Sequence, residues 1–68
     1  MSKFFAVTNV QDNRKMMYIA KDAVISLRAV DTYTLQTYPG VQTLINLPRE
    51  TVYAEESIEN IRNWIDSK

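Results

Sequence analysis

Apolar and β-branched residues recur in short runs along most of the chain, and polar or turn-forming residues end each run. Runs of this length, rich in Val, Ile, Phe, Tyr and Thr, predict strands. The polar stretch 9–13, with its Asn and Asp side chains, favours a turn and joins the first two runs into a hairpin. The predicted strands are residues 3–8, 15–20, 24–30, 41–47 and 51–54.

Residues 31–40 interrupt this series. Residues 32–37 have strand-like composition but little apolar face, and Pro39-Gly40 is a strong turn signal. Gly40 is the only glycine in the chain, and it can take a positive φ. We expect this segment to be the most exposed part of the chain, either an extra sheet strand or a projecting hairpin arm.

The last part of the chain changes to a helical period. Glu55 and Glu56 precede Ser57, a typical N-cap, and acidic residues at this end are favoured by the helix dipole. Apolar residues then follow at spacings of three and four, which predicts one amphipathic helix from Ile58 to Lys68. The apolar stripe of this helix consists of Ile58, Ile61, Trp64 and Ile65.

Together these elements predict an α+β fold. A chain of 68 residues makes one small domain, residues 1–68. We expect a single antiparallel β-sheet of about four to six strands, a β-meander, packed by one C-terminal α-helix. Alternation places Arg28 in water and predicts a core of Val7, Ile19, Ile25, Leu27, Ile45, Leu47, Val52, Ile58, Ile61 and Ile65.

The composition argues against several kinds of catalytic and ligand-binding site. The chain has no cysteine and no histidine, the residues that most often supply thiolate nucleophiles, general bases and zinc ligands. One glycine cannot build a Gly-rich phosphate loop, and the spacing of the acids predicts no metal site. We therefore expect no catalytic residues, no cofactor and no metal. The apolar N-terminal stretch is too short for a signal peptide or membrane span, which favours a cytoplasmic protein.

The most suggestive functional feature is a surplus of apolar residues beyond those one small core can hold. An apolar second sheet face is typical of a partner-binding surface, so we expect a protein partner or a homo-oligomer. An equally acceptable interpretation is that segment 31–40 folds over that face within one chain. The candidate partner-binding residues are Phe4, Met16, Tyr18, Arg28, Tyr33, Leu35 and Tyr38.

A second hypothesis is binding of nucleic acid or a nucleotide ligand. Exposed aromatic side chains can stack on bases, and Arg14, Lys15 and Arg28 could contact phosphate. However, eight basic and eight acidic residues cancel, and no basic excess marks a nucleic-acid surface. Protein binding is therefore the leading hypothesis.

The order of these features resembles the FlbD-like flagellar and swarming-motility proteins. That similarity implies a small β-rich fold closed by a helix and a role as a motility accessory. Compact modules of this kind also occur among phage-encoded inhibitors of host machinery. Two Asn-Gly turns usual in the family are replaced here by Asp12-Asn13 and Pro48-Arg49, and residues 31–40 are extra length. The resemblance rests on Val7-Thr8, Met17-Tyr18-Ile19, Asp22, Val24-Ile25, Thr43-Leu44-Ile45-Asn46-Leu47 and the passage from Val52 to Ile61.

Overall fold

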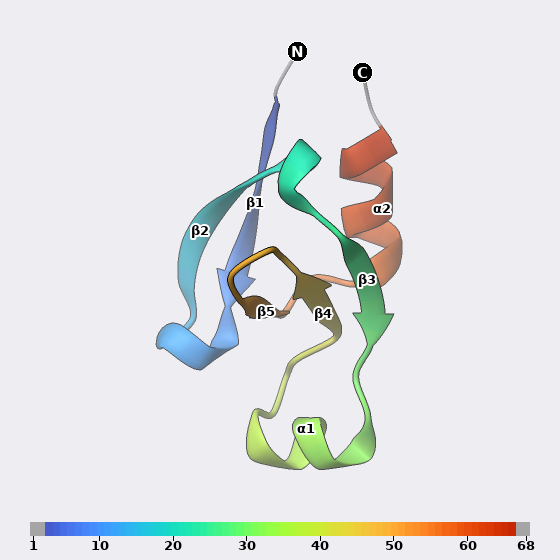
Figure 1. Ribbon diagram of the computed structural model, residues 1–68. Coiled ribbons are helices and arrows are strands. Elements are labelled where there is room, and N and C mark those ends of the chain that lie inside the picture. Colours follow the sequence, from blue (N-terminus) through green and yellow to red (C-terminus); the bar gives the residue numbers. More distant parts are fainter. Residues whose placement is uncertain (1–2, 67–68) are drawn as a thin grey trace.

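Five antiparallel strands form one sheet in the order β2-β1-β5-β4-β3, and a C-terminal helix packs beside it (Figure 1). The structure is a computed structural model that describes residues 3–66. The order is meander-like, with β5 returning to lie beside β1. The predicted α+β fold, one antiparallel sheet with a closing helix, is confirmed. The elements are β1 (Phe4–Asn9), β2 (Lys15–Ala20), β3 (Ser26–Ala29), β4 (Thr43–Asn46), β5 (Thr51–Ala54) and α2 (Ile58–Asp66).

The first two strands form the predicted hairpin. Their register runs from Phe4 opposite Ala20 to Asn9 opposite Lys15. The connection contains a 3₁₀ turn, η1 (Val10–Asp12), which begins where the Asn9 side chain accepts a hydrogen bond from the Gln11 N–H at 3.1 Å. Asn13 and Arg14 then take positive φ values of 55° and 56°. Asn adopts this left-handed conformation more readily than most residues, so the turn chemistry agrees with the sequence.

The second side of β1 is paired much less completely. Only Asn9, opposite Ala54, is in register with β5. By contrast, β4 pairs with β5 from Thr43 to Asn46 and with β3 over the same residues. Among the described residues the sheet is therefore continuous at the end of β1, and β5 does not pair with the beginning of β1.

The core lies between the inner face of the sheet and α2. Its buried cluster consists of Phe5, Val7, Ile19, Ile45, Val52, Ala54 and Ile61. Most predicted inward positions are correct, including Leu27, Leu47 and Ile65 as partly buried neighbours of that cluster. Phe5 and Ala54 belong to it although the sequence pattern did not select them. Val41 and Thr43 are also fully enclosed.

The prediction for Ile25 is wrong. Its side chain is 67% exposed, and Val24 packs against the core instead. A second 3₁₀ turn, η2 (Lys21–Ala23), immediately precedes these residues, and β3 begins only at Ser26. Simple alternation along 24–30 therefore assigned the wrong face to the two residues between the turn and the strand.

Residues 32–37 form neither a sheet strand nor a hairpin arm but a short helix, α1 (Thr32–Thr37). The Asp31 side chain caps it by accepting the Thr34 N–H at 2.7 Å, and these hydrogen bonds from Thr34 hold the pKa of Asp31 below its ordinary value. This local capping outweighs the β propensity of the threonines. After the helix, Gly40 takes a φ of 96° and completes the predicted turn.

The C-terminal helix begins as predicted. Ser57 accepts the Asn60 N–H on its hydroxyl at 3.2 Å and the Ile61 N–H on its carbonyl at 3.1 Å. Ile61 is the fully buried residue of this helix, and Ile65 lies beside the core. The predicted helix end at Lys68 lies outside the described residues. Because a helix this short is marginal alone, packing of Ile61 against the sheet must stabilise it.

Candidate functional site

The outer face of the β1–β2 hairpin carries three large apolar side chains in water. Phe4, Met16 and Tyr18 are 53%, 67% and 76% exposed. They occupy alternate positions on two paired strands, so they share the face opposite to that of Phe5 and Ile19. We call these three residues the outer hairpin face.

Small side chains lie between them. Ala6 is in register with Tyr18, and Ala20 is in register with Phe4. These alanines extend the apolar surface without covering it. Segment 31–40 leaves these three residues exposed, so it does not fold over the hairpin part of the second sheet face; its Tyr38 packs instead against Tyr53 of β5. Physically, the cap at Asp31 turns the segment into α1, which lies at the far end of the molecule from the start of β1 (Figure 1).

The other candidate partner residues lie elsewhere. Tyr33 and Leu35 are exposed on α1, and Arg28 is exposed on β3, the opposite edge of the sheet. Tyr38 is half-buried: its ring meets Tyr53 edge-on at 5.0 Å. The structure therefore gathers three of the seven candidates in one place and separates the rest.

The cations of the nucleic-acid hypothesis do not share one surface. Arg14 lies in the hairpin turn, where it donates to the Pro39 carbonyl at 3.0 Å and meets the Glu55 carboxylate at 3.5 Å. Lys15 follows at the start of β2, and Arg28 is on the other edge strand. These positions favour local structure at Arg14 over a common phosphate-binding surface.

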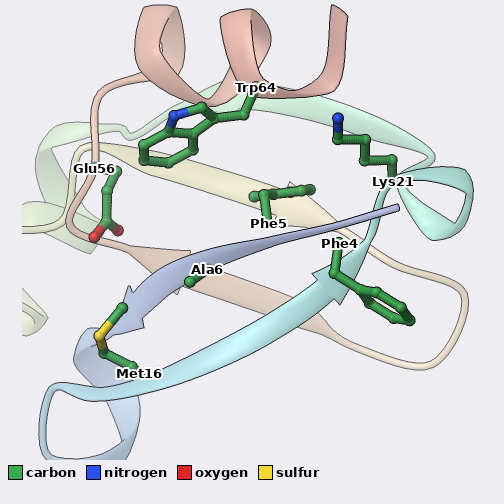
Figure 2. A pocket seen from close by; sticks show the side chains of 7 residues that line it. All are labelled: Phe4, Phe5, Ala6, Met16, Lys21, Glu56 and Trp64. Atoms are coloured by element: carbon green, nitrogen blue, oxygen red, sulfur yellow. The ribbon is translucent and has the colours of Figure 1, made fainter. Parts of the chain in front are cut away.

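A groove runs beside the beginning of β1 and has a volume of about 440 Å³. Figure 2 shows Phe5 pointing toward α2 and Trp64 projecting from that helix over the strand. The two rings are 6.3 Å apart between centroids, and Trp64 remains 38% exposed. We call this the β1 groove; its lining residues are Phe4, Phe5, Ala6, Met16, Lys21, Glu56 and Trp64.

Glu56 closes one end of the β1 groove. Its carboxylate accepts the Thr8 N–H at 2.8 Å and the Thr8 hydroxyl at 2.9 Å. Its backbone carbonyl accepts the hydroxyl of buried Thr43 at 2.9 Å. The residue therefore ties the start of α2 to both β1 and β4. Sequence analysis missed this role because it depends on chain segments 48 residues apart.

Within residues 3–66, no three acidic side chains form a cluster that could hold a metal ion. None of the helices in that range has the length and apolar character needed to cross a membrane. The chain matches no protein-family model, no curated protein and no solved structure. The resemblance to the FlbD-like proteins stays a prediction that these comparisons do not test.

Proposed function

We propose that this chain is a non-catalytic protein-binding module that acts by occupying a partner's surface, with a second copy of itself as the first partner to test. The observation that carries the proposal is the outer hairpin face. Phe4, Met16 and Tyr18 expose large apolar surfaces to water on a hairpin whose two strands are paired along their length. Aromatic and Met side chains are enriched at protein contacts, where few residues supply most of the binding free energy.

Both roles suggested by the sequence, a motility accessory and an inhibitor of host machinery, depend on binding to another protein. A motility accessory and an inhibitor of a larger machine each work by binding, without a reaction of their own. A contact on the outer hairpin face would also remove apolar area that now faces solvent. The proposal therefore accounts for apolar side chains on this face, which packing in the core on the other side of the hairpin does not explain.

The test is molar mass in solution, measured by light scattering and sedimentation over a wide range of protein concentration. We expect the native chain to self-associate and Tyr18→Ser to weaken that association about tenfold or more, as for a central aromatic contact. Tyr33→Ser is the matched control because Tyr33 is 78% exposed but lies on α1. It should leave the association unchanged.

If the native chain is monomeric at every concentration, self-association is refuted. The same two variants then decide between a different protein partner and no partner, in affinity purification from the native host. Identical captured proteins for native chain and Tyr18→Ser would refute the outer hairpin face as a binding surface. An equal effect of the Tyr33→Ser control would also count against it.

A further inference from the structure

One edge of β1 faces away from β2, its hairpin partner, and toward α2. Thr8 shows this directly: its N–H donates to Glu56, and its carbonyl accepts the Glu55 N–H at 3.1 Å. In an antiparallel pair, alternate residues direct both backbone groups to the same side. Ala6, two residues earlier on the strand, therefore directs its N–H and C=O to this same edge.

Strand β5 does not continue along that edge. β5 ends at Ala54, opposite Asn9, and the following residues turn away into α2. The Glu56 carboxylate then accepts the Thr8 N–H, in the role that a neighbouring strand's carbonyl would fill. In the described part of the chain, no residue is in register with Ala6 on this side. Among residues 3–66, the strand position beside Ala6 is therefore open.

The β1 groove occupies this open position. Trp64 and Phe5 form an apolar wall on the side of α2, while Ala6 leaves the strand edge sterically accessible (Figure 2). Its volume of about 440 Å³ lies within the range of sites that bind small ligands and peptide side chains. The edge around Ala6, residues 5–7, is about 10 Å long at the rise of an extended strand. This is room for a short extended segment.

We propose that the β1 groove binds an extended peptide segment of a partner protein, which adds to the sheet as a strand beside β1. The Ala6 backbone groups would pair with the peptide backbone, and an apolar side chain of the peptide would lie against Phe5 and Trp64. Strand addition is a recurrent recognition mode in which the main chain supplies affinity and alternate side chains supply specificity. Glu56 at one end of the groove favours a peptide with a positive charge at its corresponding end.

A second copy of this chain is a poorer occupant. Its own β1 edge carries the same adjacent helix and Trp64, so two such edges would bring two helices together before the strands could pair. The outer edge of β2 is less suitable than the β1 groove, because Lys15 is the first residue of that strand and Lys21 follows its last. Lysine at an exposed strand edge disfavours pairing with another chain. A slender segment with no helix of its own fits the geometry better.

This inference rests on the proposed protein-binding function and adds the form of the segment that is bound. Its test uses a phage-displayed library of random nine-residue peptides, selected on the native chain. Enriched peptides are then synthesised with N-methyl groups on alternate residues, in two complementary sets. Binding is measured by calorimetry and by amide shifts in NMR spectra of the labelled protein.

We expect one N-methylated set to lose about tenfold or more in affinity and the other to change by less than about threefold, because only alternate amides of an added strand face β1. Shifts should concentrate at Ala6 and at the Trp64 indole. Ala6→Pro, which removes an N–H that makes no bond to β2, should weaken binding similarly, as should Trp64→Ala. Tyr33→Ser is the control, since Tyr33 lies on α1 and does not line the groove, and it should have no effect.

Equal effects of the two N-methylated sets would overturn strand addition. So would failure to select any peptide whose binding shifts Ala6, and so would self-association of the native chain that shifts Ala6 and Trp64 without peptide. If Ala6→Pro fails to fold, the N-methylated peptides still decide the question on the native chain. Loss of peptide binding on Tyr18→Ser with no change at Ala6 would place the contact on the outer hairpin face. That result would support the proposed function while refuting this inference.

Discussion

The carboxylate of Glu56 offers the sharpest test of how this small domain is held together. Its two oxygens accept the N–H and the hydroxyl of Thr8, which joins the entrance of α2 to β1. We predict that Glu56→Ala destabilises the fold substantially. The substitution leaves the Thr8 N–H without its acceptor and releases the loop that leads into α2.

The magnitude follows from the two hydrogen bonds. Hydrogen bonds to charged groups contribute about 1.5–3 kcal/mol when enclosed, and the partly buried position of these two reduces each to about 1–1.5 kcal/mol. The expected loss is therefore about 2–3 kcal/mol. A domain of 68 residues has a total unfolding free energy of roughly 3–10 kcal/mol, so the loss is a large fraction of the whole.

The assay is equilibrium urea unfolding, monitored by the fluorescence of Trp64. This residue is on α2 and contacts Phe5 of β1, so its surroundings change when the helix leaves the sheet. With a slope of about 1 kcal/mol per molar urea, Glu56→Ala should lower the midpoint by about 2 M. Thr8→Val, which removes the hydroxyl but keeps the N–H, should cost about 1 kcal/mol. Combining it with Glu56→Ala should show that the two effects are not additive, because they remove the same hydrogen bond.

The neighbouring acid is the matched control. Glu55 makes a solvent-exposed ion pair with Arg14 at 3.5 Å, and such pairs contribute about 0–1 kcal/mol. Glu55→Ala should therefore shift the midpoint far less. If both alanine variants unfold at the same urea concentration, or if Glu56→Ala combines additively with Thr8→Val, the reasoning is refuted.

Two further predictions concern the helices. Ile61→Ala should lower the free energy of unfolding in urea by about 2–5 kcal/mol, and Ile61→Val by about 0.5–1.5 kcal/mol, because Ile61 is fully buried under the sheet. The control is Arg62→Ala, at an exposed position, which should change that free energy by no more than about 0.5 kcal/mol. An equal loss for both alanine variants would contradict the assigned core. The hydrogen bonds from Thr34 lower the pKa of Asp31 in the folded protein. The stability that the Asp31 cap gives to α1 should therefore be complete at pH values above about 3.9, the pKa of the unfolded chain, and should be lost as the pH falls through the lower pKa of the folded protein. The measurement is the chemical shift of the Thr34 amide in an NMR pH titration. Asp31→Asn, which keeps an uncharged cap, is the control, and its Thr34 amide should not respond to pH. A Thr34 amide that does not respond to pH in the native chain would refute the prediction.

The sequence predicted those elements whose signals are local. Alternation and turn residues were sufficient for the first hairpin, and Ser57 with the apolar stripe that includes Ile61 was sufficient for α2. The same alternation placed Phe4, Met16 and Tyr18 on one face, which the structure exposes. These results depend on residues close together in the chain, where propensity and period apply directly.

The errors arose where two local signals competed. In residues 32–37 the threonines favoured a strand, but the Asp31 side chain captured the Thr34 N–H and began a helix. Before β3, the 3₁₀ turn η2 changed which of Val24 and Ile25 faces inward. A one-residue change of phase is sufficient to move a side chain to the other face of a sheet.

The β1 groove could not have been predicted from local pattern, because it depends on where α2 must lie. Burying Ile61 requires the chain to leave the sheet just after Ala54, at the point where β5 would otherwise continue beside β1. A longer β5 would pair the edge at Ala6, but it would carry the helix away from the core. The open edge is therefore the structural consequence of closing this small core with a helix. Glu56 pairs with the part of that edge nearest the turn, at Thr8, and among residues 3–66 no strand pairs with Ala6 on this side.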